Sequence, residues 1–161
     1  MFVEFNALPD HSRVWIYQSN RKFLPEEVEQ IQLRTQEFLE QWTAHGQNLE
    51  AGFEVRHNRF IVIGLNQENA SASGCSIDAS VHFIQSLEKE FDLDLMDKMN
   101  VTFYNGPYIA HKTLADFKAM AKSRSVSGKT VVFNNLVNTK AEYKEHWEVP
   151  AKESWHSRFL A

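Results

Sequence analysis

The longest apolar run in the sequence, Phe60 to Leu65, most constrains what this chain can fold into. It is far shorter than the about 18 to 20 apolar residues of a membrane-spanning helix, and three of its six residues are β-branched. The run therefore predicts a strand that is buried on both faces. Phe53 and Val55 alternate with polar neighbours just before it, and His57-Asn58-Arg59 separate the two segments. We expect the two segments to form an antiparallel hairpin.

Two amphipathic helices are expected around this hairpin. Arg13–Tyr17 predicts a further strand covered on both faces, and Pro25 then begins a helix, because its fixed φ and the acidic residues after it suit a helix N-terminus. Apolar residues recur at helical spacing as far as Trp42, and Gly46 is expected to end this helix. A polar loop, Asn66–Ser73, precedes the second helix. The expected core positions of that helix are Ile77, Val81, Ile84, Leu87 and Phe91.

The remaining segments predict an α+β fold. We expect a strand at Asn100–Tyr104, a helix capped near Thr113 and a last strand at Thr130–Val137. The order strand, helix, strand, strand, helix, strand matches the split βαβ plan of a ferredoxin-like sheet with its helices on one face, here with a C-terminal helix and strand added. We expect one domain over residues 1–161 that ends in an aromatic tail at about 139–161.

Composition limits the classes of function. With 43% apolar and 24% charged residues, the chain has the make-up of an ordinary globular protein. Its net charge of -4 and the lack of a long cationic block argue against nucleic-acid binding. The single Cys75 forms no intramolecular disulfide, and the N-terminus lacks the basic and apolar regions of a secretion signal. We expect a cytoplasmic protein without membrane insertion.

Residues whose side chains can react or bind a ligand concentrate at the start of the second helix, in Gly74-Cys75-Ser76-Ile77-Asp78. At 100° per residue, Cys75, Asp78 and His82 share a face that is not the core. The positive end of a helix stabilises a thiolate, so Cys75 is a candidate nucleophile. Because His82 lies two turns away, about 10 Å along the helix, it is too distant to activate the thiol. The candidate bases are His45 and His111, which could approach Cys75 in space.

The second function that we consider for the same helix start is ligand binding without catalysis. Its hydroxyls and unpaired N–H groups suit a small anion, and the candidate ligand-binding residues are Ser73, Gly74, Ser76 and Asp78. The alternative is simple capping of the helix by Ser73 or Ser76. Since Cys75, Asp78 and His82 spread over two turns, they lack the spacing of metal ligands on one helix. We expect neither a metal nor a cofactor.

Four segments together resemble a family of uncharacterised bacterial proteins labelled "ABC transporter ATPase", and the resemblance covers nearly the whole chain. The segments are Arg13-Val14-Trp15-Ile16-Tyr17, Trp42-Thr43-Ala44-His45-Gly46, Gly74-Cys75-Ser76-Ile77-Asp78 and His146-Trp147-Glu148-Val149-Pro150. The label implies nucleotide binding, but the resemblance carries no catalytic residue or cofactor with it. An ATPase of that kind needs a phosphate loop that opens a helix. Ser127-Gly128-Lys129-Thr130 instead leads into a strand, and Ser123 stands at the first glycine position, so we interpret this segment as a turn.

Our leading interpretation is a noncatalytic binding or protein-interaction module that forms a homo-oligomer. It rests on the two-sided strand Arg13–Tyr17 and on the aromatic residues of the tail. A thiol-dependent enzyme with Cys75 as nucleophile is the alternative from a different class. A structural partner of a larger assembly would look the same in sequence, and a nucleotide-binding ATPase is disfavoured.

Overall fold

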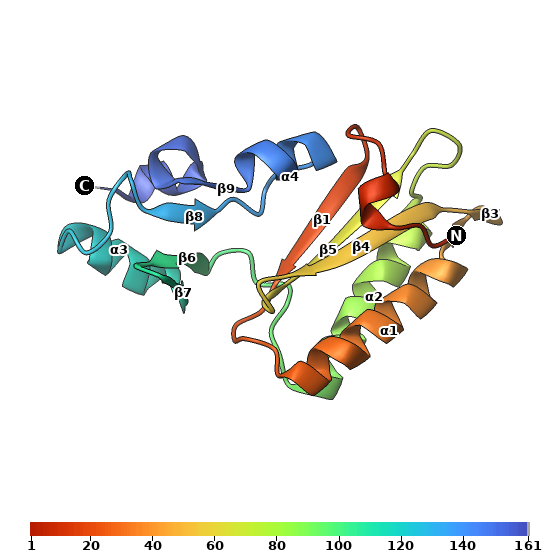
Figure 1. Ribbon diagram of the computed structural model, residues 1–161, viewed down its shortest axis with the longest axis horizontal. Helices are drawn as coiled ribbons and strands as arrows, with labels where there is room; N and C mark the ends of the chain where they lie inside the picture. Colours follow the sequence, from red (N-terminus) through yellow and green to blue (C-terminus); the bar gives the residue numbers. More distant parts are fainter. Residues whose placement is uncertain (161) are drawn as a thin grey trace. The chain divides into compact units, whose positions relative to one another are not determined.

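The computed structural model describes residues 1–160 and confirms an α+β fold built from helices and antiparallel strands (Figure 1). The internal contacts divide the chain into two compact units. The first comprises residues 1–96 with 138–141, and the second comprises residues 97–137 with the chain from residue 142 onward. Each unit is described by itself. That both fold as one domain stays a prediction.

The first unit contains a three-stranded antiparallel sheet. Its strands are β1 (Arg13–Gln18), β4 (Glu50–Arg56) and β5 (Phe60–Asn66), in the order β1-β5-β4. β5 pairs with both neighbours in antiparallel register, and every residue along it is buried. This is the strand that the longest apolar run predicts, and the hairpin formed by β4 and β5 is confirmed.

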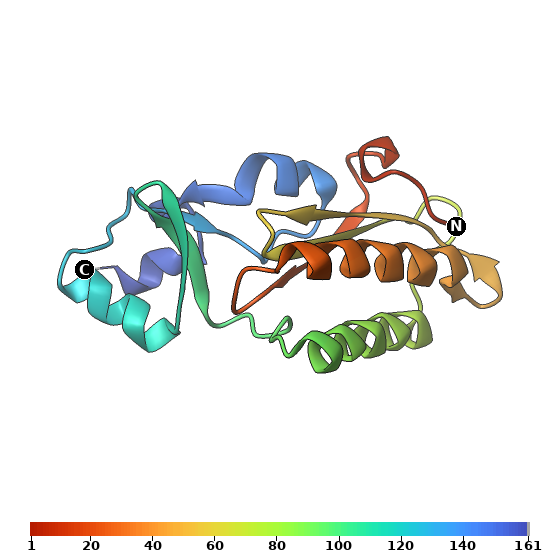
Figure 2. The ribbon, with the colours of Figure 1, turned by 60° about the horizontal axis from the view of Figure 1, so that its bottom comes forward.

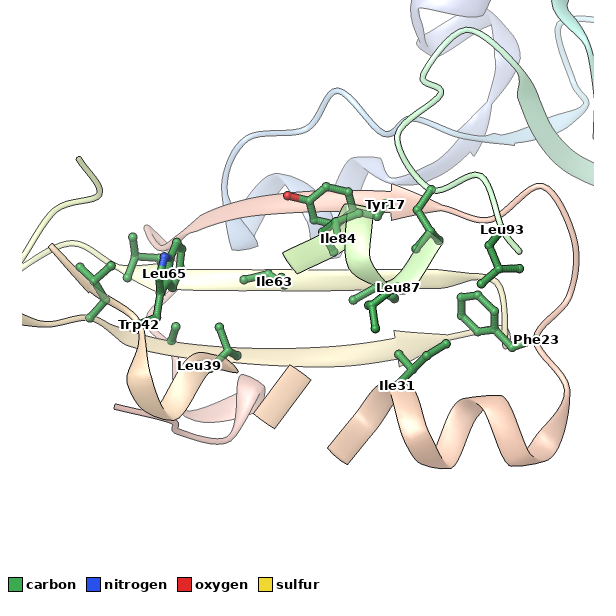
Figure 3. Close-up of a cluster of buried hydrophobic side chains, with 14 of the residues drawn as sticks. Tyr17, Phe23, Ile31, Leu39, Trp42, Ile63, Leu65, Ile84, Leu87 and Leu93 are labelled. Carbon is green, nitrogen blue, oxygen red and sulfur yellow. The ribbon is translucent and has the colours of Figure 1, made fainter. Parts of the chain in front are cut away.

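Two helices pack against one face of this sheet. They are α1 (Pro25–Gln41) and α2 (Gly74–Phe91), which lie side by side along the strands (Figure 2). The rings of Phe38 on α1 and Phe83 on α2 are stacked with their centroids 4.6 Å apart. Figure 3 shows how the core side chains of both helices meet those of the strands. The core includes Tyr17, Ile31, Leu39, Ile63, Leu65, Ile84 and Leu87.

A short 3-10 helix, η1 (Phe5–Ala7), packs closely on the glycines of the sheet. A Cβ atom on Gly64 would lie 2.7 Å from the Leu8 side chain, and one on Gly52 would lie 2.5 Å from the Val3 carbonyl oxygen. The Leu8 methyl group is the end of a flexible side chain and can shift, whereas the Val3 carbonyl is backbone, so Gly52 is the position that requires glycine. The N-terminal segment is held there by a hydrogen bond from Val3 N–H to the carbonyl of Ala51, at 2.8 Å.

The outer edge of β1 carries an isolated bridge instead of a full fourth strand. Thr139 pairs antiparallel with Arg13, and Val14 N–H donates to the carbonyl of Asn138 at 2.9 Å. We expected Asn100–Tyr104 to complete this sheet, and that assignment is wrong. The segment forms β6 (Val101–Asn105), which belongs to a separate sheet where it pairs on both sides.

The second unit is built around this four-stranded sheet. Its strands are β6, β7 (Tyr108–Lys112), β8 (Val131–Phe133) and β9 (Glu148–Pro150), in the antiparallel order β7-β6-β8-β9. The helix expected near Thr113 is α3 (Leu114–Lys122), and its Phe117 ring lies 5.5 Å from that of Phe103. The aromatic tail forms α4 (Lys140–His146), whose first two residues belong to the first unit, and two 3-10 helices, η2 (Ala151–Glu153) and η3 (Trp155–Phe159).

Candidate functional site

A small hairpin follows α1 and forms one wall of the candidate site. Its strands are β2 (Thr43–Ala44) and β3 (Gln47–Asn48), joined by His45 and Gly46. Both turn residues have positive φ, 52° and 78°, as a two-residue hairpin of the favoured twist requires. We had expected Gly46 to end α1, and that expectation is wrong, because Gly46 forms part of this turn. The helix already ends at Gln41.

The start of α2 is capped by two serines. Ser73 Oγ accepts a hydrogen bond from Ser76 N–H at 3.1 Å, and Ser76 Oγ accepts one from Ser73 N–H at 2.7 Å. This reciprocal pair confirms the capping role that the sequence predicted. The next two N–H groups, those of Gly74 and Cys75, lie in the first turn, where an α-helix offers no intrahelical acceptor.

Trp42 joins the end of α1 to the start of α2. Its Nε1 donates a buried hydrogen bond to the carbonyl of Ser76 at 2.8 Å, and its side chain is 3% exposed. The Trp42 ring lies 6.0 Å from that of Trp15 and 5.6 Å from that of Phe38. These contacts fix the positions of the two helix ends relative to each other.

Between α1, the hairpin and α2 lies a cleft of about 520 Å³. This volume is within the range of small-molecule sites, about 300 to 1,000 Å³. It is lined by Phe38, Gln41 and Trp42 from the end of α1, Thr43 and His45 from the hairpin, and Ser73, Cys75, Ser76 and Ala79 from the start of α2 and its cap. The lining contains no carboxylate, lysine or arginine, and its one imidazole and one thiol are those of His45 and Cys75.

The cleft brings together four of the residues singled out from the sequence. His45, Ser73, Cys75 and Ser76 all line it, and both Cys75 and His45 are exposed. Gly74 and Asp78, which we predicted as ligand-binding residues, are not among the lining residues.

His111 lies in the second unit, on β7. Its Nδ1 is 3.0 Å from Thr102 Oγ1 on the neighbouring strand β6, and it is not among the residues that line the cleft. Of the two histidines proposed as a base for Cys75, His45 is therefore the one found in the cleft.

The exposed face of α2 is as predicted, but its buried face is turned from the expected one. Cys75, Asp78 and His82 are all exposed. The buried positions are Ser76, Ser80, Ile84 and Leu87, whereas Ile77 and Val81 are only half-buried. Two serines take core positions because their hydroxyls find acceptors in the helix backbone.

Ser80 illustrates how the core accommodates a hydroxyl. Its Oγ donates to the carbonyl of Ile77 at 2.6 Å, and it also forms a hydrogen bond with the Tyr17 side chain. Burial raises the pKa of Tyr17 above its usual value by disfavouring the phenolate, and the hydrogen bond with Ser80 opposes that rise. The phenol is thus a neutral hydrogen-bonding partner at neutral pH.

Five lining residues were not singled out from the sequence as site residues: Phe38, Gln41, Trp42, Thr43 and Ala79. The helical spacing assigned Phe38 and Trp42 to the apolar face of α1, and Gln41, Thr43 and Ala79 carry no chemical signal of their own. Only the hairpin that follows α1 brings them beside the start of α2. No signal in the sequence specified that two-stranded hairpin, because each strand is only a dipeptide.

Two other features considered from the sequence are a metal site and the segment Ser127–Thr130. Within residues 1–160 no cluster of histidine, cysteine, aspartate or glutamate is arranged to hold a metal ion. Ser127–Thr130 forms the turn that we predicted, in which Thr130 N–H donates to the carbonyl of Ser127 at 3.1 Å, and β8 follows directly.

Comparisons of the chain with models of known protein families, with curated proteins and with solved structures find no significant match. No helix within residues 1–160 has the combined length and apolar character that crossing a membrane requires.

Proposed function

We propose that the protein is a noncatalytic binding module whose cleft at the start of α2 takes a small ligand with an anionic group. The observation that carries this proposal is the cleft itself, with Ser73, Cys75 and Ser76 in its lining. An anionic group is favoured beside the first turn of α2, because the helix dipole is positive there and the N–H groups of Gly74 and Cys75 have no intrahelical acceptor. Phe38 offers an apolar surface for the rest of the ligand.

The proposal extends to the wider properties of the chain. We place the first unit in the ferredoxin-like class, with residues 138–141 at the edge where a fourth strand would lie. The antiparallel bridge between Arg13 and Thr139 supports this assignment. We further propose that the protein is cytoplasmic and forms a homo-oligomer, for which the support is the single free Cys75 and the aromatic content of the tail.

Titration with inorganic phosphate tests the cleft directly. In ¹H–¹⁵N spectra, the amides of Gly74 and Cys75 are expected to shift in a saturable manner, with a Kd of about 1 to 10 mM for so small a ligand. In Ala79→Phe the new ring occupies the cleft. We expect the affinity for phosphate, measured from the same amide shifts, to fall at least about tenfold.

Asp78→Asn is the matched control, because Asp78 is exposed on the same helix and does not line the cleft. We expect it to bind phosphate at least as tightly as the unaltered protein, since it removes a nearby negative charge. Shifts that do not saturate, or that survive unchanged in a folded Ala79→Phe protein, would rule the cleft out as the anion site.

A thiol-dependent enzyme is the second candidate, favoured by one specific observation. Cys75 and His45 line the same cleft, and the thiol is exposed there. In such an enzyme His45 would take the proton of the Cys75 thiol, and the thiolate would attack the substrate. The test is the pH profile of Cys75 alkylation by iodoacetamide.

If His45 activates Cys75, His45→Gln is expected to slow alkylation at pH 7 by about tenfold and to move the half-maximal rate to higher pH. His82→Gln is the control, because His82 is exposed on α2 but lies outside the cleft lining. Equal rates and equal profiles in the three proteins would exclude His45 as the base.

A further inference from the structure

The second unit carries an apolar groove that is independent of the cleft. It has a volume of about 200 Å³ and is lined by Lys98, Met99, Leu136, Trp155, Arg158 and Phe159. Met99 and Leu136 are 58% and 52% exposed, so two large apolar side chains face solvent at one place. The groove is thus a surface where apolar and cationic side chains meet.

Tight turns hold the segments that form this groove. Met99 N–H donates to Asp97 Oδ1 at 2.9 Å, and Leu136 N–H donates to Asn134 Oδ1 at 3.2 Å. In each turn a polar side chain accepts from the backbone two residues later. The exposed apolar side chains therefore sit on backbone that is already ordered, which lowers the entropy cost of binding a partner.

The aromatic wall of the groove is also ordered. Trp155 begins η3, and Ser154 caps this helix through its Oγ, which accepts from His156 N–H at 3.2 Å. The Trp155 ring stacks on that of His156 at 3.9 Å and meets the Phe159 ring edge-on at 5.9 Å. Aromatic residues, methionine and arginine are the types enriched at protein interfaces.

Charge indicates the chemistry of the partner. The groove lining contains two cations, Lys98 and Arg158, and no carboxylate. Lys118 adds a third cation, with its Nζ 4.8 Å from the centre of the Phe159 ring. The neighbouring carboxylate of Asp97 is directed into its own turn, where it accepts from Met99 N–H and from Asn100 Nδ2. This local excess of positive charge occurs in a chain whose net charge is -4.

The size of the groove favours a peptide over a free small molecule. Sites for drug-sized ligands occupy about 300 to 1,000 Å³, and this groove is smaller than that range. A volume of this size suits one or two aliphatic side chains. We infer that the groove is a docking site for an acidic peptide segment of a partner protein, which inserts a leucine-like side chain between Leu136 and Trp155 and places carboxylates beside Lys98 and Arg158.

The experiment uses the full chain and a fluorescein-labelled heptapeptide with one leucine flanked by three glutamates on each side. Fluorescence anisotropy is expected to give a Kd below about 1 mM, and ¹H–¹³C spectra are expected to show shifts of the Met99 and Leu136 methyl groups. Replacing the leucine of the peptide by serine, or its glutamates by lysines, is expected to abolish binding. Raising the salt from about 50 to about 500 mM is expected to weaken it severalfold.

Two variants of the groove and one control complete the test. Leu136→Asp and Arg158→Glu are each expected to weaken binding at least about tenfold, because the first removes the apolar contact and the second repels the peptide. Leu33→Asp is the matched control, since Leu33 is 55% exposed on α1. Circular dichroism confirms that each variant is folded.

The inference is overturned by equal binding of the lysine peptide, by an undiminished affinity in folded Leu136→Asp, or by no binding at millimolar peptide. It is also overturned if Leu136→Asp abolishes self-association of the chain without peptide, because a second copy would then occupy the groove. The cleft in the first unit plays no part in any of these outcomes, so phosphate binding there and peptide binding here succeed or fail separately.

Discussion

Replacing Lys140 with methionine is expected to lower the free energy of unfolding of the first unit by about 2 to 4 kcal/mol. Lys140 is 6% exposed, and its Nζ donates to three backbone carbonyl oxygens: Phe5 at 3.2 Å, Asn6 at 3.1 Å and Leu8 at 2.6 Å. The ammonium also lies 5.4 Å from the centre of the Phe5 ring. Methionine keeps the length of the side chain but donates nothing, so the carbonyl oxygens of Phe5, Asn6 and Leu8 each lose this donor, and that of Phe5 keeps the N–H of Leu8 at 3.1 Å.

Two comparisons make this prediction specific. Exchanging a charged group for an apolar one can be neutral when its partner is exchanged as well, but here the carbonyl groups remain and stay desolvated. Lys144→Met is the control, because Lys144 is exposed on the same helix, and its effect is expected to stay within about 0.5 kcal/mol. Urea unfolding followed by tryptophan fluorescence measures both variants. Equal stability of the two would show that the three hydrogen bonds contribute no net stability.

The burial of Lys140 is a feature that no pattern in the sequence predicts. A lysine in a charged, aromatic tail is expected to face solvent, since this residue type is almost never fully buried without partners. Its acceptors lie 132 to 135 residues away in the chain and are backbone atoms, which have no residue-type signature. The burial of this lysine could not be predicted, because it depends on where two distant segments meet.

The fold was predictable where a pattern concerns one element or two adjacent ones. The apolar run gave β5, alternation and turn residues gave the β4–β5 hairpin, and helical spacing gave α1 and α2 close to their observed bounds. Partner choice between distant strands was not predictable from the same patterns. The segment of β6 has the composition of any buried strand, and its pairing with β7 and β8 depends on residues that follow it.

The candidate site was predictable in part for the same reason. The start of α2 was found because glycine, cysteine and serines at a helix N-terminus have local meaning. His45 was named only as a residue that could approach Cys75, and the hairpin of β2 and β3 is what places both in one cleft. The groove of the second unit was beyond prediction, because Met99, Leu136 and Trp155 are far apart in the sequence and no periodicity links them.

A second large loss of stability is expected when the pH is lowered. Lowering the pH from 7.5 to 4.5 is expected to destabilise the second unit by about 2 to 3 kcal/mol through His156 alone. This side chain is 1% exposed, its Nδ1 lies 2.6 Å from Ser154 Oγ, and its ring packs against those of Phe117 and Trp155. Burial lowers the pKa of His156 from its ordinary 6.5 to about 4 by disfavouring the charged imidazolium.

Acid destabilises the protein because His156 binds protons differently in the folded and the unfolded chain. Between pH 6.5 and 4 the unfolded chain binds a proton at His156 and the folded chain does not, so acid favours unfolding over this window. The stabilising contribution is complete above about pH 6.5 and is lost as the pH falls toward 4. Carboxylates also titrate in this range, and a variant is needed to separate their contribution.

His156→Asn provides that separation. Its side-chain amide takes a place near Nδ1 and offers both a donor and an acceptor to Ser154 Oγ, but the residue does not titrate. We expect this variant to be less stable at pH 7.5 and to lose about 2 to 3 kcal/mol less than the unaltered protein between pH 7.5 and 4.5. His82→Asn, at an exposed position, is expected to keep the original pH dependence. Urea unfolding at the two pH values measures all three proteins, and parallel losses in all of them would mean that His156 is protonated in the folded chain.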